Sequence, residues 1–221
     1  MSDSVKIINV NIPDFKLARI ANLSHGIERD FDELVEDKRF EKDIRLVKNL
    51  WKWGHHSIFE FLQIIWYIKL PIFSERQLLR HRTFSYNEKS LRYVKLKGDE
   101  KIEGYIKEDW NDNIKDNVKD LYNLSRMHYN ILIKSGIPAE EARVVLPLGL
   151  QTELYMRTDG RNLYNFLKLR LDKHAQEDIR LMAKDMLLEL KNNNKTKILY
   201  EIYLESLFKD NILKEGDIEW Y

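Results

Sequence analysis

The stretch RHRTFSYNEKSLRY, residues 80 to 93, concentrates four cationic side chains, a histidine and a glutamate among aromatic and hydroxyl groups. Guanidinium groups bind phosphate through paired donors. Ser90 and Arg92 are two residues apart and would share a face of an extended segment, while Gln77 and Arg80 would share a face of a helix. This pattern predicts a nucleotide monophosphate site. A solvated, charged surface is the alternative interpretation.

The first three residues of this stretch constrain the number of ligands. If Arg80, His81 and Arg82 lie on one helix, successive side chains project about 100° apart and fan across roughly 200°. Three side chains in this arrangement cannot all face one flat ligand. We therefore expect two ligands, or two subunits, to meet here.

Composition excludes several classes of protein. The chain has 221 residues, of which 43% are hydrophobic, and a formal net charge of +1, which argues against disorder and against a protein that wraps nucleic acid. It has no cysteine, so disulfides, thiolate metal sites and a cysteine nucleophile are excluded. His55-His56 lacks the spacing of a metal site. We see no signal peptide or membrane span, and we expect a cytoplasmic protein.

Apolar periodicity predicts a mixed α/β globule, with a central sheet flanked by long helices, in one domain over residues 1–221. We expect strands at 5–10, 59–70 and 151–156, the second of them buried. We expect helices that begin at Pro13, that end at Gly54, that run from a Ser74 cap through Arg82, that end at Gly136, that begin at Pro138, and that cover 163–167 and 182–190.

Four sequence blocks together resemble one family. Arg80-His81-Arg82, seven residues and then Ser90 match the RHR-x7-S signature of the flavin-dependent thymidylate synthases, and the similarity continues through Tyr93. GHHSIFE at 54–60 is similar to the family's G-H-x-[ST]-x-F-E segment, and ARVVLP at 142–147 to its A-R-x-V-L-P segment. RNLYNFLKLRLDKHAQ at 161–176 resembles its carboxyl-terminal block. The resemblance implies that family's fold.

The resemblance also implies a homotetramer in which FAD and dUMP bind at sites shared between subunits. It implies FAD contacts for Ser57, Arg80, His81, Arg82, Glu88, Asp159, Arg161, Asn165 and His174. It implies dUMP contacts for Gln77, Arg80, Glu88, Ser90, Arg92, Arg143 and Arg170, with Arg170 as the catalytic residue against the uracil. It implies that His55 and Tyr93 border the folate pocket.

Spacing agrees with these roles in part. Arg161 and Asn165 can share a helical face, as can Arg170 and His174. Asn165 and His174 are nine residues apart and fall on opposite sides of an ideal helix. The helix must therefore end or bend near Asp172, or the two residues serve the sites of different subunits.

The implied reaction is the reductive methylation of dUMP to dTMP. Methylenetetrahydrofolate supplies the carbon, NADPH reduces FAD, and reduced flavin supplies the hydride. Classical thymidylate synthase adds a thiolate to the uracil, and this chain has none. The Arg170 cation is expected to stabilise negative charge on the ring. Ser90 is interpreted as a substrate-binding residue because an alcohol nucleophile needs an adjacent base.

Two positions depart from the family pattern. Phe61 stands where a histidine commonly follows the glutamate, and we expect it in the core. Asp159 stands where asparagine is common, and it would bring a carboxylate near the flavin. Two other hypotheses stay open: a related flavin- and folate-dependent pyrimidine nucleotide hydroxymethylase, and a nucleotide- or RNA-binding module without chemistry.

Overall fold

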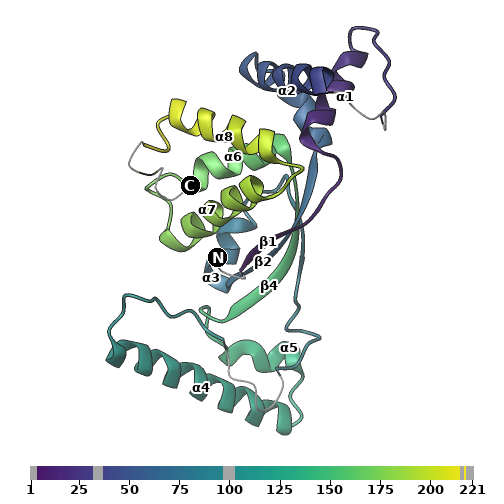
Figure 1. Cartoon of the computed structure of the whole chain (residues 1–221). Helices are drawn as coiled ribbons and strands as arrows, with labels where there is room; N and C mark the ends of the chain where they lie inside the picture. The colour runs from purple at the N-terminus through teal and green to yellow at the C-terminus, as the bar shows by residue number, and fades with distance from the viewer. Residues whose placement is uncertain (1–3, 32–36, 97–102, 215–216, 218–221) are drawn as a thin grey trace. The chain divides into compact units, whose positions relative to one another are not determined.

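The computed structural model describes residues 4–31, 37–96, 103–214 and 217. Its strands form one four-stranded sheet in the order β1-β2-β4-β3. Figure 1 labels β1, β2 and β4 of this sheet. The strands are β1 (Val5–Val10), β2 (Gln63–Pro71), β3 (Ser85–Glu88) and β4 (Gln151–Asp159). The α-helices are α1 (Leu17–Leu23), α2 (Asp37–Lys52), α3 (Ile72–Leu78), α4 (Asp112–Lys134), α5 (Ala139–Ala142), α6 (Gly160–Arg170), α7 (Glu177–Asn192) and α8 (Lys197–Lys209), with short 3-10 helices η1 (Asp14–Lys16), η2 (His56–Phe61) and η3 (Arg143–Val145). The predicted mixed fold class is confirmed.

The two long strands, β2 and β4, pair in one antiparallel register. At one end the Gly160 N–H donates to the Leu62 carbonyl at 2.9 Å, and at the other the Ile72 N–H donates to the Leu150 carbonyl at 3.0 Å. Burial alternates along both strands, as expected of a sheet with one face on the core. The alternating buried residues are Ile64, Trp66, Ile68 and Leu70 of β2 and Thr152, Leu154, Met156 and Thr158 of β4, and Pro71 at the end of β2 is buried as well.

The predicted strand at 59–70 therefore needs two corrections. It begins at Gln63, because residues 56–61 form the 3-10 helix η2. It is buried on one face only, since Ile65 is 37% exposed. The continuous run of apolar residues indicated a strand buried on both faces. In the structure the first part of that run belongs to η2, and the rest belongs to β2, where buried and more exposed residues alternate.

The described residues form two compact units. The first comprises Met1–Tyr67, His81–Ser85 and Tyr155–Tyr221, and the second comprises Ile68–Arg80 and Tyr86–Leu154. Strands β2 and β4 pass from one unit into the other. Each unit contributes its own set of candidate site residues.

Aromatic side chains from α2, η2, α6 and α8 form the core of one side of the first unit. The Trp51 ring lies 4.8 Å from Phe59, 5.0 Å from Tyr164 and 5.5 Å from Tyr203. α6 begins against this cluster at Gly160, where a Cβ atom would stand 2.9 Å from the Phe59 carbonyl oxygen. Any other residue would push α6 away from η2, so this glycine sets the position of the helix that carries several candidate residues.

A buried carboxylate joins the amino-terminal segment to α8. The Asp14 Oδ2 atom accepts hydrogen bonds from the N–H groups of Ile198 at 2.7 Å and Leu199 at 3.0 Å. These are first-turn donors of α8 that no preceding carbonyl can satisfy. Burial raises the pKa of Asp14 to about 6 despite these bonds. Asp14 therefore caps a helix that starts more than 180 residues later in the chain.

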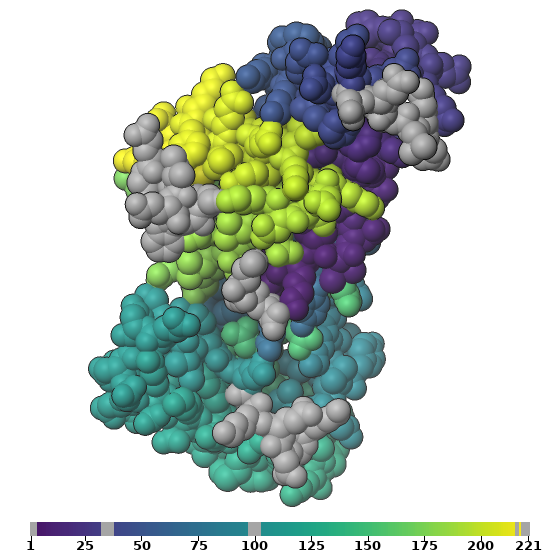
Figure 2. Space-filling model, in the orientation of Figure 1, coloured from purple at the N-terminus to yellow at the C-terminus, as the bar shows by residue number. Residues whose placement is uncertain are grey.

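The second unit is built around α4. The Asn111 side chain caps this helix by accepting from the Ile114 N–H at 3.0 Å, and Gly136, with φ at +84°, follows its end as predicted. Tyr122 packs where a Cβ on Gly104 or Gly149 would overlap its side chain. α4 lies open at the surface in teal (Figure 2). Neither α4 nor any other helix in the described ranges is long and apolar enough to cross a membrane.

Candidate active site

The segment that joins α3 to β3 carries the cationic run, and it is not helical. α3 ends at Leu78, so the predicted helix through Arg82 is wrong, and Ser74 lies buried within α3 instead of capping it. The chain turns, with the Phe84 N–H donating to the His81 carbonyl at 3.1 Å. This turn buries Phe84, which is 6% exposed. Arg80, His81 and Arg82 therefore do not project from one helix at intervals of about 100°, as predicted from the sequence.

His81 and Arg170 meet within the first unit. The Arg170 Nε–H donates to His81 Nε2 at 3.0 Å, and the rings of Phe84 and Phe166 lie 5.7 and 4.7 Å from the imidazole. Burial, and next the positive charge of Arg170, lower the pKa of His81 to about 4. His81 is therefore neutral near pH 7, and the bond assigns its proton to Nδ1. His81 thus orients the Arg170 guanidinium without bringing a negative charge to it.

The start of α6 holds three predicted residues. The Asp159 carboxylate caps the helix, with Oδ1 accepting from the Asn162 N–H at 2.9 Å and Oδ2 from the Asn162 side-chain amide at 2.8 Å. Arg161 and Asn165 are exposed on one helical face, as their spacing predicted. Arg161 also pairs with Glu60 at 2.6 Å. The departure at Asp159 thus has a structural explanation as a helix cap.

The η2 segment presents alternate residues to solvent. His55 and Ser57 are exposed, whereas His56 stacks on Trp51 at 4.2 Å between ring centroids. Phe61, predicted to lie in the core, is 57% exposed, so that prediction is wrong. The reason is its position: it is the last residue of η2 and precedes the residues of β2 that alternate into the core.

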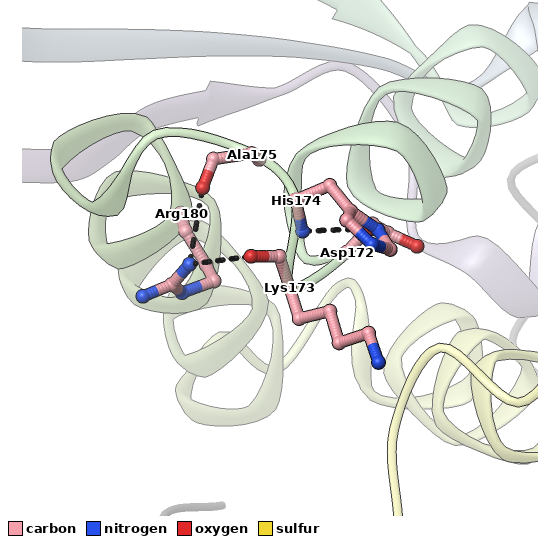
Figure 3. Close-up of polar contacts among 5 residues, drawn as sticks. All are labelled: Asp172, Lys173, His174, Ala175 and Arg180. Carbon is pink, nitrogen blue, oxygen red and sulfur yellow. Dashed lines mark hydrogen bonds and ion pairs between the residues drawn. The ribbon is translucent and has the colours of Figure 1, made fainter.

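His174 lies in the loop between α6 and α7, beyond the end of its helix (Figure 3). The prediction that the helix ends or bends near Asp172 is confirmed, because α6 stops at Arg170. The expectation from spacing that Arg170 and His174 share one helical face is wrong for the same reason. Asp172 holds His174 through two contacts, at 2.8 Å to its backbone N–H and 2.7 Å to its Nδ1.

The second unit brings together Arg92 and Arg143 around Glu140. The Arg92 guanidinium lies 3.4 Å from the Glu140 carboxylate, and Arg143 Nε–H donates to the Glu140 carbonyl at 3.0 Å. Ser90 and Arg92 do not lie in an extended strand as predicted. They form a turn in which the Ser90 Oγ accepts from the Arg92 N–H at 3.3 Å. Arg92 and Arg143 thus both contact Glu140 although they are far apart in the sequence, so their spacing could not predict this proximity.

The other candidates of this unit lie on α3, β3 and the turn that follows. Gln77 is half-buried in α3 and Arg80 is exposed just beyond it. Glu88 accepts a hydrogen bond from the Thr152 hydroxyl at 2.7 Å. Tyr93 is 79% exposed, with the Arg92 guanidinium 5.5 Å from its ring centre. Glu88 is thus oriented by Thr152, a buried residue of β4.

Sequence reasoning missed one acidic residue beside this set. Glu75 on α3 is only 4% exposed, and its Oε1 atom is buried without a hydrogen-bond partner among the described residues. Burial, and next the negative charge of Glu88, raise the pKa of Glu75 to about 7, although Arg76 lowers it. An acidic residue next to an arginine on a short helix is typical of an exposed surface, so nothing in the sequence indicated that Glu75 is buried.

Comparison with known proteins gives a consistent result. A model of the family described as Thymidylate synthase complementing protein matches residues 6–193. A flavin-dependent thymidylate synthase of Thermotoga neapolitana is 35% identical over 219 residues, which covers 96% of this chain and 95% of that protein. One from Thermus thermophilus is 36% identical over 196 residues, or 81% and 68%.

A solved structure is similar over nearly the same length. It is the crystal structure of a UMP/dUMP methylase PolB from Streptomyces cacaoi bound with 5-Br dUMP, with a TM-score of 0.74 at 25% identity. The similarity covers 91% of this chain and 94% of that one. Fold and sequence together define the class of the protein, which is an enzyme.

The chain belongs to the flavin-dependent thymidylate synthase family. The matched residues, 6–193, include all four blocks on which the resemblance was based. The relative from Thermotoga neapolitana extends the similarity to almost the whole chain.

Glu75→Gln tests the buried acid. Because the folded state raises the pKa of Glu75 above its ordinary value of 4.5, its contribution to stability is full below about pH 4.5 and is lost as pH rises through about 7. We expect the variant to match the parent near pH 4.5 and to exceed it by about 1 to 3 kcal/mol at pH 8. Urea unfolding at both pH values measures the difference.

The matched control is Glu141→Gln, which removes an exposed carboxylate of α5 in the same unit. It should change stability little at either pH. A loss of stability in Glu75→Gln that is equal at both pH values would contradict the assignment of a buried, protonated acid.

Proposed function

We propose that this enzyme converts dUMP to dTMP by reductive methylation. The observation that carries the proposal is the family match over residues 6–193, which contains the cationic segment 80–93. In the balanced reaction dUMP, methylenetetrahydrofolate and reduced FAD give dTMP, tetrahydrofolate and oxidised FAD. NADPH and a proton then restore reduced FAD.

The residues of the first unit fit a flavin dinucleotide. Arg82 and Arg161 are exposed guanidinium groups suited to a diphosphate, and Ser57, Asn165 and His174 offer exposed polar atoms for its other parts. A bound flavin would supply the hydride. Arg161 now pairs with the half-exposed Glu60, and exposed pairs of this kind contribute little. A diphosphate can therefore take the place of that carboxylate at small cost.

Arg170 would act on the uracil through its charge. Its Nε–H is held by His81, and this bond fixes the plane of the guanidinium. Because burial keeps His81 neutral, this contact adds no negative charge beside the guanidinium, whose own positive charge can stabilise negative charge as carbon 5 of the uracil becomes nucleophilic. A carboxylate at position 81 would remove this effect. The arrangement supports activation of the ring without a thiolate.

Ser90 would bind substrate and not attack it. Its Oγ accepts from the Arg92 N–H, and within the described ranges no histidine or carboxylate side chain is hydrogen-bonded to it. Serine needs such a base to act as a nucleophile. With Arg92, Arg143 and Gln77 it instead supplies donors for the phosphate and sugar of dUMP.

Product analysis tests the proposal. We expect purified protein with FAD, NADPH, methylenetetrahydrofolate and dUMP to yield a nucleotide heavier by one methylene unit, read by mass spectrometry. A gain of a CH2O unit would instead identify a hydroxymethylase. No flavin absorbance and no turnover would leave only the binding module. UMP is assayed in parallel because PolB is described as a UMP/dUMP methylase.

Arg92→Ala should separate the substrate from the cofactor. Loss of one charged hydrogen bond to phosphate should weaken dUMP binding by about 1.5 to 3 kcal/mol and leave FAD affinity unchanged. Isothermal titration with each ligand measures both. Lys89→Ala is the control. It removes a cation from the same segment, and the Nζ atom of Lys89 pairs with Glu153 at 3.7 Å. Equal loss of both ligands in Arg92→Ala would argue against this division of roles.

The same proposal includes a homotetramer. α4 exposes apolar side chains along one face, at helical spacing, and each is between 43% and 53% exposed: Ile114, Leu121, Leu124, Met127 and Ile131. A contiguous exposed apolar stripe of this kind marks an interaction surface in soluble proteins. Further copies of the chain would cover it.

Sedimentation velocity tests the assembly. We expect a tetramer mass for the parent protein and smaller species for Leu124→Glu, because a charge in a covered apolar face costs several kcal/mol unless it is paired. Asn123→Glu, an exposed polar neighbour on α4, should remain tetrameric. A parent protein that sediments as a monomer at micromolar concentration would refute the tetramer.

A further inference from the structure

The loop between α6 and α7 is short and contains an exposed histidine. α6 ends at Arg170 and α7 begins at Glu177, and the His174 side chain between them is 80% exposed. An exposed imidazole in a loop ordinarily samples several rotamers, and ordering it on binding costs free energy. The contacts around His174 reduce this freedom from two sides.

Asp172 makes the first set of contacts. Its Oδ1 atom lies 2.8 Å from the His174 backbone nitrogen and 2.7 Å from the imidazole Nδ1. One oxygen atom therefore fixes both the peptide and the ring of the same residue. The two bonds, the backbone one first, lower the pKa of Asp172, so the acceptor is a carboxylate at neutral pH.

Arg180 makes the second set from the first turn of α7. Its Nη1 donates to the Ala175 carbonyl at 3.0 Å and to the Lys173 carbonyl at 3.3 Å. These carbonyls belong to the two residues that flank His174 (Figure 3). The backbone is thus tied to α7 immediately before and after the histidine.

We propose that Asp172 and Arg180 are positioning residues that hold His174 ready to contact the flavin. The inference rests on the proposed function, which gives His174 a flavin contact. Arg180 fixes the backbone and Asp172 fixes the ring, so neither has to touch the ligand. Supporting contacts of this kind determine how precisely a binding group is presented.

The contact with Asp172 also selects the tautomer. An ionised carboxylate beside Nδ1 requires the proton on that nitrogen, which leaves Nε2 as the hydrogen-bond acceptor of the neutral ring. The matching group on a ligand is a ring N–H. An isoalloxazine carries one at N3, and its reduced form carries another at N5. Loss of the Asp172 carboxylate should therefore change which ring nitrogen of His174 can accept a hydrogen bond, even if the loop keeps its shape.

Arg180→Met is the first test, because it keeps much of the stem and removes every donor. We expect exchange of the His174 and Ala175 backbone N–H groups to accelerate roughly tenfold and the Kd for FAD to rise roughly tenfold. Arg180→Lys, which retains a donor, should recover part of both losses. Lys173→Met is the matched control: in Figure 3 the Lys173 side chain points away from Arg180, and its removal should change neither quantity.

Asp172→Asn is the second test, because asparagine can still accept from the backbone N–H. Nitrogen NMR of His174 in the ligand-free protein should show the Nδ1–H tautomer in the parent and a shift toward Nε2–H in the variant. With FAD at saturation, the flavin absorbance spectrum of the variant should shift, whereas a merely structural role would leave it unmoved.

Two outcomes overturn the inference. One is backbone exchange and tautomer populations that do not change in these variants. The other is changed exchange with FAD affinity and spectrum equal to the parent, which would make the loop contacts structural only. Both leave the proposed function intact if the parent still forms dTMP. A parent protein that binds no FAD would refute the proposed function itself, independently of the exchange result.

Discussion

The antiparallel pairing of β2 with β4 is the constraint on which the positions of the family segments depend. Its register places Gly160 beside Leu62 at one end and Ile72 beside Leu150 at the other. Because η2 precedes β2 and α6 follows β4, the first end joins the segment at 54–60 to the block that begins at 161, and Arg161 reaches Glu60. At the other end, the start of α3 meets the residues that follow the segment at 142–147, with the Phe73 N–H bonded to the Leu148 carbonyl at 3.1 Å. Segments about 75 to 100 residues apart thus become neighbours through one ladder.

The candidate cations differ in the partners that hold them, and the difference matters for chemistry. Arg161 and Arg92 pair with half-exposed carboxylates, which a phosphate can displace because such pairs are weak in water. Arg170 instead donates to a neutral, half-buried histidine. A carboxylate partner brings a negative charge to the guanidinium, whereas a neutral acceptor orients it without adding one. The contact with His81 therefore differs in charge from the carboxylate pairs of Arg161 and Arg92.

Local signals in the sequence predicted some features well. Gly54 and Gly136 both adopt positive φ and follow the ends of their helices, because few other residues adopt that conformation without strain. The strand at 5–10 was predicted with its observed bounds, and alternation predicted the strand at 151–156, which continues to Asp159. The conflict between Asn165 and His174 on one helix predicted that α6 ends or bends near Asp172. The four blocks located the candidate segments. These features depend on a few neighbouring residues, which a sequence shows directly.

Two of the failures share one physical cause, because each depends on a partner distant in the chain. Phe84 turns the cationic segment out of the helix because it packs on Phe166, and Glu75 is buried by neighbours that its own helix does not reveal. Asp159 is the opposite case, because the partner that explains it, Asn162, is a near neighbour in the sequence. A carboxylate beside an expected anionic ligand looked unfavourable, yet both of its oxygens accept hydrogen bonds from Asn162 at the start of α6. The positive end of a helix stabilises a capping carboxylate, so much of its charge is already compensated before a ligand arrives. The departure from the family pattern therefore keeps the cap of α6, and with it the direction in which Arg161 and Asn165 project.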